Sequence, residues 1–199
     1  ENCSVIQPLV VCGPSGVGKG TIIAKFMEEH GGSNDFEFTV SHTTRKPRQG
    51  EIDGHHYHFT DYDSMKGAIG RGEFLEYAEV HGNFYGTSIK SLRDVNGKRP
   101  ILDIDVQGVK NVKTQVKEDS SALQPKYIFI SPPSMDTLRK RLESRGTETE
   151  ESLKKRTENA RAEMEYGTAK GNFDEIVVND DLDKACDDFA AAVAKIYSE

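Results

Sequence analysis

Residues 13–21, Gly-Pro-Ser-Gly-Val-Gly-Lys-Gly-Thr, have a composition typical of a backbone loop that holds phosphate groups. Glycines let the chain curl until several N–H groups point inward, and the start of a following helix adds partial positive charge. Lys19 can then reach the outer phosphates of a nucleoside triphosphate. Gly20 departs from the usual pattern, which has Ser or Thr here to contact magnesium. The loop predicts a nucleotide site, without identifying the nucleotide, made of Gly13, Pro14, Ser15, Gly16, Val17, Gly18, Lys19, Gly20 and Thr21.

Arginines form a second group of candidate phosphate ligands. Phosphoryl transfer needs cations that neutralise the phosphates and a geometry that brings donor and acceptor into line. Arg45 and Arg48 bracket a proline, Arg141 and Arg145 are four residues apart and would share a helix face, and Arg156 follows. Guanidinium groups bind phosphate through two parallel hydrogen bonds. For Arg141 or Arg156 taken alone, a solvated position on a charged surface helix is the more frequent situation.

Two aspartates end an apolar run, Leu-Asp-Ile-Asp-Val at residues 102–106. The period of two in a strand points Asp103 and Asp105 to the same side. In phosphate-loop folds, a carboxylate at the carboxyl end of a neighbouring strand holds magnesium, directly or through water. Because carboxylates are costly to bury without partners, a functional role is favoured over a structural one.

Glu76 lies in an aromatic-rich region that also holds Tyr57 and Tyr85. A carboxylate only accepts hydrogen bonds. Guanine presents adjacent N1–H and N2–H donors, whereas adenine presents an unprotonated N1, so a buried Glu would pair with guanine. The two tyrosines could donate to a phosphate, although an isolated Tyr in a strand is usually a core residue. The nearby His55, His56 and His58 lack the further ligands of a tetrahedral metal site, and a solvated strand is the default for them.

The elements that must position these residues follow from the apolar runs. Short, β-rich runs alternate with helical stretches, which indicates a parallel sheet covered on both faces. The runs are Leu9–Cys12, 101–106, 127–130 and Glu175–Val178. Near the carboxyl end, helical spacing of Leu182, Cys186, Phe189, Val193 and Ile196 predicts a packing face.

Two segments interrupt this alternation, so we predict three parts. Residues 1–34, 98–142 and 162–199 form the nucleotide-binding core. Residues 35–97, rich in aromatics with alternation at 36–40, form a small, largely antiparallel insertion with its own binding surface. Residues 143–161 form a second, charged insertion, where Thr147 to Glu150 match a capping box that starts a helix.

Composition narrows the class of protein. The 199 residues carry a net charge of −7, which argues against general nucleic-acid binding. No apolar run reaches the length of a membrane span, and no signal-peptide pattern is present. The three cysteines are widely spaced and odd in number, which fits reduced thiols. We therefore expect a cytoplasmic protein that binds neither nucleic acid nor membranes.

Taken together, these motifs resemble those of guanylate kinases, P-loop enzymes that phosphorylate GMP with ATP. The likeness covers essentially the whole chain, and several motifs in the right order are far more specific than one. They are the phosphate loop, residues 40–48, 51–57, 74–76, 82–87, 101–108, 141–156 and 178–181. The resemblance implies a three-layer α/β fold with a parallel sheet core, a small mixed β GMP-binding insertion at 35–97 and a helical lid at 143–161.

The resemblance also implies a role for each matching residue. The expected GMP ligands are Arg45, Arg48, Tyr57 and Tyr85 at the phosphate and Ser41, Glu76, Thr87 and Asp105 at the base, with Asp103 near the acceptor and the metal. The expected catalytic cations are Lys19, Arg45, Arg141, Arg145 and Arg156, the last two carried by the lid. Asn179 and Asp180 would lie beside the adenine of ATP. Mg²⁺ would accompany the ATP, held by Asp103 through water, with Thr21 as a further candidate ligand.

Two departures from the family pattern leave alternatives open. Gly20 and Thr21 follow the loop lysine as in adenylate kinases, which suggests another nucleoside-monophosphate kinase, but Glu76 argues against adenine. His42 replaces the second Ser of the usual Ser-Ser-Thr-Thr-Arg. A non-catalytic, guanylate-kinase-like binding domain is the other alternative, although such domains usually lack an intact phosphate loop. The use of dGMP and the choice between monomer and homodimer stay open.

Overall fold

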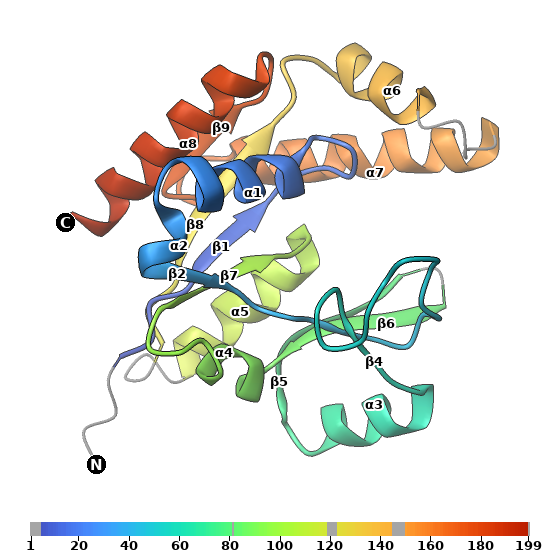
Figure 1. The fold of residues 1–199 in the computed structure, drawn as a ribbon. Helices are drawn as coiled ribbons and strands as arrows, with labels where there is room; N and C mark the ends of the chain where they lie inside the picture. Colours follow the sequence, from blue (N-terminus) through green and yellow to red (C-terminus); the bar gives the residue numbers. More distant parts are fainter. Residues whose placement is uncertain (1–4, 81, 119–122, 145–149, 199) are drawn as a thin grey trace. The chain divides into compact units, whose positions relative to one another are not determined.

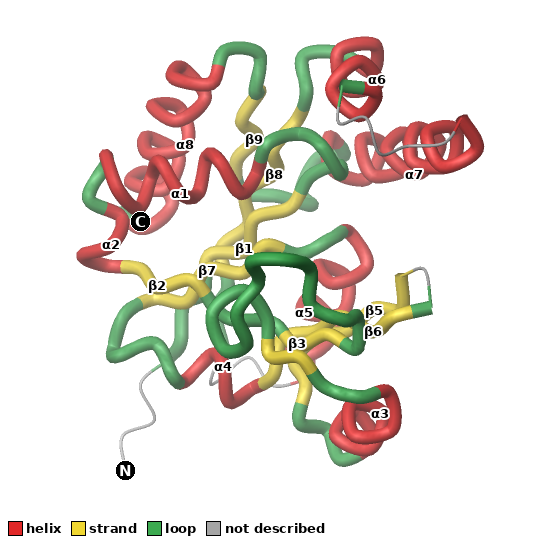
Figure 2. Tube along the Cα trace, turned by 45° about the vertical axis from the view of Figure 1, so that its right-hand side comes forward, coloured by secondary structure: helices red, strands yellow, loops and turns green. Residues whose placement is uncertain are grey.

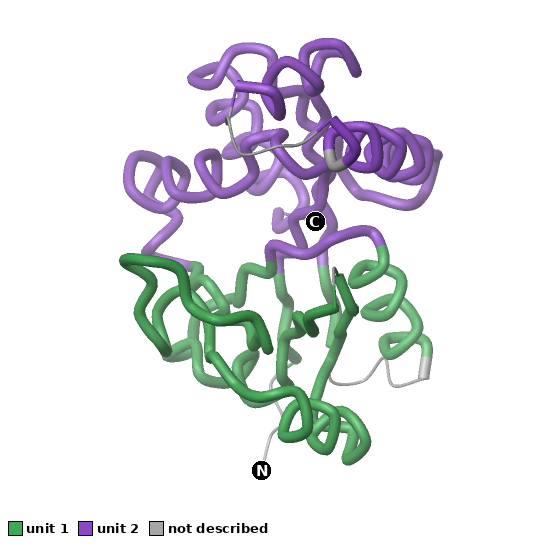
Figure 3. Tube along the Cα trace, turned by 90° about the vertical axis from the view of Figure 1, so that its right-hand side faces the viewer, with its two compact units in different colours: residues 1–8, 36–102, 107–125 green, residues 9–35, 103–106, 126–199 purple. Residues whose placement is uncertain are grey.

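The computed structural model describes residues 5–80, 82–118, 123–144 and 150–198. The chain divides into two compact units, coloured separately in Figure 3. Unit 1 holds residues 1–8, 36–102 and 107–125, and unit 2 holds residues 9–35, 103–106 and 126–199. The proposed acceptor-binding residues of the 35–97 region thus fall in unit 1 and the phosphate loop in unit 2.

Each of the four predicted apolar runs overlaps a strand of the structure, although the strand in the run 101–106 ends at Asp103, before Asp105 (Figure 1). The elements are β1 Leu9–Cys12, α1 Lys19–Glu29, α2 Gly32–Asp35, β2 Phe36–Phe38, β3 His42–Thr43, β4 His58–Phe59, α3 Tyr62–Gly70, β5 Phe74–Val80, β6 Asn83–Ser88, α4 Ile89–Arg93, β7 Arg99–Asp103, α5 Val106–Glu118, β8 Lys126–Ser131, α6 Met135–Glu143, α7 Glu150–Thr168, β9 Glu175–Val178 and α8 Leu182–Tyr197.

The larger sheet has five strands in the order β2-β7-β1-β8-β9, and its described registers are parallel. All four residues of β1 are fully buried, as expected for a strand covered on both faces. One expectation is corrected here. Residues 36–40 were expected in the antiparallel insertion, but β2 pairs in parallel with β7. A strand of three residues, Phe-Glu-Phe, is too short for its pattern to distinguish the two kinds of pairing.

The smaller sheet lies within unit 1 and has the order β4-β3-β6-β5. Its pairing is mixed, because β3 pairs in parallel with β4 whereas β6 is antiparallel to both β3 and β5. Helix α3 packs on one face of this sheet, visible as the red helix beside the yellow strands in Figure 2. Met65 of α3, Phe74 and Phe84 form a small core there.

Helices α1 and α8 pack together in unit 2. Phe26 of α1 and Phe189 of α8 meet edge to face, with ring centroids 5.3 Å apart. The predicted packing face of α8 is confirmed for Cys186, Phe189, Val193 and Ile196, which are all buried. Leu182 differs, because it is 37% exposed at the first turn of α8.

The fold class is confirmed as α/β with a parallel five-stranded sheet and a small mixed sheet. The three-part division of the chain stays a prediction. The capping box at 147–150 lies mostly outside the described residues, and α7 is described from Glu150 onward. Within the described ranges, every helix is too short or too polar to cross a lipid bilayer.

Candidate functional site

The predicted phosphate loop connects β1 to α1 in unit 2, and its backbone conformation requires glycine. Gly18 adopts a left-handed conformation, with φ 96°, immediately before the first residue of α1. A Cβ atom on Gly18 would lie 2.7 Å from Nδ2 of Asn179. Within the described chain, α1 begins without a side-chain cap or an acidic residue in its first turn. The N–H groups at this helix start are therefore open to an anion.

Lys19 is folded back over the loop. Its Nζ donates to the carbonyl oxygen of Gly13 at 2.7 Å and lies 3.4 Å from that of Pro14. The same nitrogen is 3.8 Å from Oδ1 of Asp103 at the end of β7. Burial raises the pKa of Asp103, and the positive charge of Lys19 opposes that rise. The loop thus has a cation that carbonyl oxygens and a carboxylate hold in place.

Asn179 braces the loop from the residue after β9. Its side-chain amide donates to the carbonyl of Val17 at 2.8 Å, and its own N–H donates to Ser131 at 2.8 Å. Asn179 is 5% exposed. This side chain is thus occupied with the loop backbone, a role that the motif alone did not indicate.

Arg141 on α6 lies near the residue that follows Asn179. Its Nη2 donates to the carbonyl oxygen of Asp180 at 3.4 Å. Its Nη1 is buried and has no hydrogen-bond partner among the described residues. A buried guanidinium nitrogen without an acceptor is suited to an anionic ligand, because leaving such a donor unpaired is costly.

The carboxylates of unit 2 indicate whether the residues around the phosphate loop could hold a magnesium ion. Asp103 and Asp105 are both partly exposed, Asp103 lies 3.8 Å from Nζ of Lys19, and a Cβ atom on Gly20 would meet nothing within 4 Å. The described residues contain no cluster of three His, Cys, Asp or Glu that could enclose a metal. Mg²⁺ bound through one or two carboxylates, waters and substrate phosphates matches this donor set.

Glu163 on α7 interacts electrostatically with Lys19 and Asp105, and the sequence motifs did not indicate it. Burial raises its pKa to about 7, Lys19 opposes the rise, and the negative charge of Asp105 adds to it. Burial raises the pKa of the Cys12 thiol in β1 to about 12. The charge of Lys19 opposes this rise, and those of Glu163 and Asp105 add to it. A glutamate within a charge-dense helix carries no signal in the sequence, so only the fold could reveal that Glu163 lies near the loop lysine.

Replacement of Glu163 by Gln should change how stability depends on pH. Between its ordinary value of 4.5 and about 7, the folded protein retains a proton that the unfolded chain has lost. Stability therefore falls as pH rises through this window, by about 3 kcal/mol. The unfolding temperature of Glu163→Gln, measured from about pH 5 to about pH 8, should fall less with rising pH than that of the wild type. Glu165→Gln, on the exposed side of α7, should keep the wild-type decline, and an equally steep decline in both variants would contradict the assignment.

In unit 1, Arg45 is held by Glu51 in a two-point ion pair. The two guanidinium nitrogens donate to the two carboxylate oxygens at 2.9 and 2.8 Å, and the N–H of Arg48 donates to the same carboxylate at 2.6 Å. The hydrogen bond to Glu51 raises the pKa of Arg45, and the same pair lowers the pKa of Glu51 to about 2. Glu51 is a positioning residue that the sequence motif did not assign.

Aromatic rings surround the same arginine. The guanidinium carbon of Arg45 lies 5.4 Å from the ring centre of Tyr57 and 5.8 Å from that of Phe59. The rings of Tyr57 and Tyr85 meet at 6.1 Å. The structure therefore brings together three predicted phosphate ligands, whereas Arg48 is exposed and contributes its backbone N–H to Glu51.

Glu76 reaches this face of the sheet because of a β-bulge in β5. Phe74 pairs with Ser88, but Glu76 pairs with Thr87, so the register shifts by one residue between them. Residues directly opposite in a sheet share a face, and the bulge therefore separates Phe74 from Glu76 although they are two apart. Glu76 is 5% exposed, and the hydroxyls of Ser41 and Thr87 are 3.3 Å apart.

The predicted site residues thus separate into two half-sites. The unit 1 half-site contains Ser41, Arg45, Arg48, Tyr57, Glu76, Tyr85 and Thr87. The unit 2 half-site contains residues 13–21, Asp103, Asp105, Arg141, Arg156, Asn179 and Asp180. Arg156 is a half-buried residue of α7, Thr21 is exposed, and Arg145 lies outside the described residues.

Comparisons with known proteins agree on one family. The family model described as guanylate kinase matches residues 5–196. A guanylate kinase of Sus scrofa is 50% identical over 90% of this chain and 87% of its own length, and one of Homo sapiens is 44% identical over 95% and 93%. The crystal structure of guanylate kinase from Anaplasma phagocytophilum superimposes with a TM-score of 0.69, at 32% identity, over 96% of this chain and 87% of that one.

Some relatives are considerably longer than this chain. Guanylate kinase 1 of Oryza sativa subsp. japonica is 53% identical over 90% of the chain, but the match covers 45% of that protein. The chain therefore spans about half the length of the first curated relatives that it matches.

Proposed function

This chain belongs to the guanylate kinase family, and we propose that it transfers the terminal phosphoryl group of ATP to GMP, giving ADP and GDP. One observation carries the choice of acceptor. Glu76 is a buried carboxylate that the bulge in β5 turns to the face of Thr87 and Ser41. A carboxylate accepts hydrogen bonds only, which matches the N1–H and N2–H donors of guanine.

The geometry of Arg45 supports the acceptor half of this proposal. An arginine that Glu51 orients and aromatic rings flank is fixed before ligand arrives, so less side-chain freedom is lost on binding. Arg45, with Tyr57 and Tyr85, would hold the phosphate of GMP. That phosphate is ionised at neutral pH, so its oxygen can attack without a general base.

The loop and its lysine support the donor half. The open N–H groups at the start of α1 would hold the inner phosphates of ATP, and Lys19 would leave its carbonyl partners to contact the outer ones. Arg141 and, by the resemblance, Arg145 and Arg156 would neutralise the charge of the transferring group. Bound Mg²⁺, with Asp103 and Asp105 nearby, would supply further charge neutralisation and orient the phosphates.

A panel of acceptors tests the proposed function. Purified protein with Mg-ATP should form ADP rapidly with GMP, more slowly or equally with dGMP, and only at background rate with AMP and UMP. A rate with AMP that equals the rate with GMP would identify another nucleoside-monophosphate kinase. Binding of GMP without ATP-dependent formation of GDP would identify a non-catalytic binding domain.

Replacement of Glu51 by Gln should weaken the acceptor half-site alone. The two-point pair with Arg45 loses its charge, so the guanidinium is less firmly placed. We expect the KM for GMP to rise about tenfold, equivalent to about 1.4 kcal/mol, while the KM for ATP stays unchanged. Steady-state kinetics with each substrate varied checks this split. Glu73→Gln, which removes an exposed pair with Arg71, is the matched control and should leave both KM values unchanged.

A further inference from the structure

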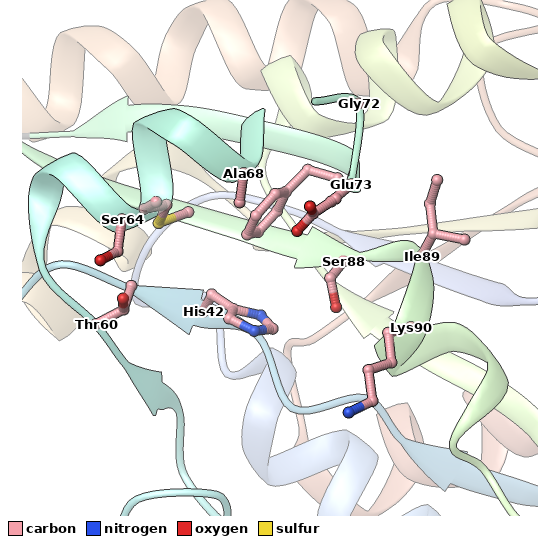
Figure 4. A pocket seen from close by; sticks show the side chains of 11 residues that line it. His42, Thr60, Ser64, Ala68, Gly72, Glu73, Ser88, Ile89 and Lys90 are labelled. Atoms are coloured by element: carbon pink, nitrogen blue, oxygen red, sulfur yellow. The ribbon is translucent and has the colours of Figure 1, made fainter. Parts of the chain in front are cut away.

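The four-stranded sheet of unit 1 has a second face, opposite Glu76 and Thr87, that also carries a cavity. The cavity has a volume of about 510 Å³ and lies between α3, the start of β5 and the start of α4. Figure 4 shows His42 below, Ser64 and Ala68 on α3 above, and Lys90 extending from α4. A volume of this size suits a small organic ligand.

The walls of the cavity belong to the reverse face of the sheet. Phe74 and Ser88 are directly opposite each other and both line it, and His42 lies opposite Gly86, two residues before Ser88. The bulge that turns Glu76 to one face leaves Phe74 on this one. The cavity is therefore separate from the acceptor half-site, although the same strands build both.

One residue of the cavity wall contains an unsatisfied polar atom. Among the described residues, two buried side-chain nitrogens have no hydrogen-bond partner, Nη1 of Arg141 and Nδ1 of His42. The first belongs to the proposed donor half-site, where an anionic ligand accounts for it. The second belongs to His42, a residue of the cavity wall, whose ring packs 5.2 Å from Phe74 and 4.7 Å from His58. The ring of His42 thus forms part of the cavity wall.

The charges of the lining favour a negative ligand. Lys90 has no acidic partner within the described chain, whereas Glu73 is paired with Arg71 at 2.6 Å. Burial, with His58 and Lys90 adding to it and Asp53 opposing, lowers the pKa of His42, so its ring carries no charge at neutral pH. The cation available to a ligand is therefore the ammonium group of Lys90.

The remainder of the lining is apolar. Met65 and Ala68 of α3, with the ring of Phe74, form one side, and Ile89 stands beside the mouth. An aromatic ring stacked against Phe74 would bury apolar area there, and its acidic substituent would reach Lys90.

We propose that this cavity is a binding site for a small amphipathic organic anion, with a planar apolar body against Phe74 and Ala68 and an acidic group at Lys90. The site goes beyond the proposed function and needs neither ATP nor GMP. No residue of the two half-sites lines it.

Binding of naphthoate, a two-ring carboxylate, tests the proposal. Saturation-transfer NMR and calorimetry on the whole chain should show one site with a dissociation constant of roughly 1 mM or below. Lys90→Gln, a surface change that keeps the fold, should weaken naphthoate about tenfold or more. Ala68→Phe should fill the cavity and abolish binding. Ala191→Phe, which fills a groove beside β9 instead, should bind as the wild type does.

Three outcomes would overturn the proposal. They are no detectable binding at about 10 mM naphthoate, equal binding by wild type and Lys90→Gln, and equal binding of the neutral alcohol naphthalenemethanol. Circular dichroism and kinase assays on each variant separate this test from that of the proposed function. An active enzyme that does not bind naphthoate contradicts only the cavity, and an inactive protein that binds it contradicts only the kinase assignment.

Discussion

Replacement of Lys19 by Met should lower turnover of GMP and ATP by about a thousandfold or more, with the fold intact. In the proposed function, the lysine is the cation that would contact the outer phosphates of ATP and neutralise their negative charge during transfer. Methionine keeps much of the apolar stem but removes the charge and the hydrogen bonds to Gly13 and Pro14. Single-turnover measurement of GDP formation isolates this step from product release.

Lys25→Met is the matched control on the same helix. Lys25 pairs with Asp183 at 2.6 Å on the surface of α1 and α8, and such exposed pairs contribute about 0–1 kcal/mol. Its loss should leave turnover unchanged. Near-normal turnover in Lys19→Met, with the same unfolding temperature as the control, would show that the loop has another role.

Replacement of Glu76 by Gln should lower kcat/KM for GMP by about a thousandfold, since two charge-assisted hydrogen bonds are each worth about 1.5–3 kcal/mol. The Gln amide presents a donor where guanine also presents donors, so one contact becomes repulsive. The KM for ATP should stay constant, because Glu76 lies in unit 1 whereas the phosphate loop lies in unit 2. The preference for GMP over AMP, measured as the ratio of the two kcat/KM values, should also fall in this variant.

Glu79→Gln provides the comparison for that variant. Glu79 is on the same strand, three pairs beyond Glu76, and is exposed. Its replacement should leave both the acceptor preference and kcat/KM unchanged. If Glu76→Gln retained its preference for GMP over AMP, base recognition would have to reside in other residues, and the bulge would lose its functional meaning.

Sequence motifs predicted the parts of this protein that short segments encode. The loop at 13–21, the buried strand β1 and the packing face of α8 each depend on residues within a few positions of one another. The parallel sheet followed from the alternation of apolar runs with helices. Pairing of β2 with β7 did not follow, because three residues carry too little pattern to choose a partner strand.

Side-chain partners within the site were beyond the reach of the motifs. Glu51 orients Arg45 from six residues away across an irregular loop, Asn179 braces a loop more than a hundred residues earlier in the chain, and Glu163 lies near Lys19 on a distant helix. These contacts depend on the path of the chain between the partners, which residue types alone do not define.

By itself, the sequence determined the chemistry available to the protein: a phosphate-holding loop, its lysine, a set of arginines and a carboxylate able to recognise guanine. The charge and hydrogen-bonding capacity of a side chain depend on its residue type, so these properties can be read without knowing the fold. Only the tertiary structure decided where those groups point. A one-residue bulge sends Glu76 to one face and Phe74 to the other, because side-chain direction in a sheet depends on register with the partner strand. The acceptor half-site and the cavity behind it both result from that single shift.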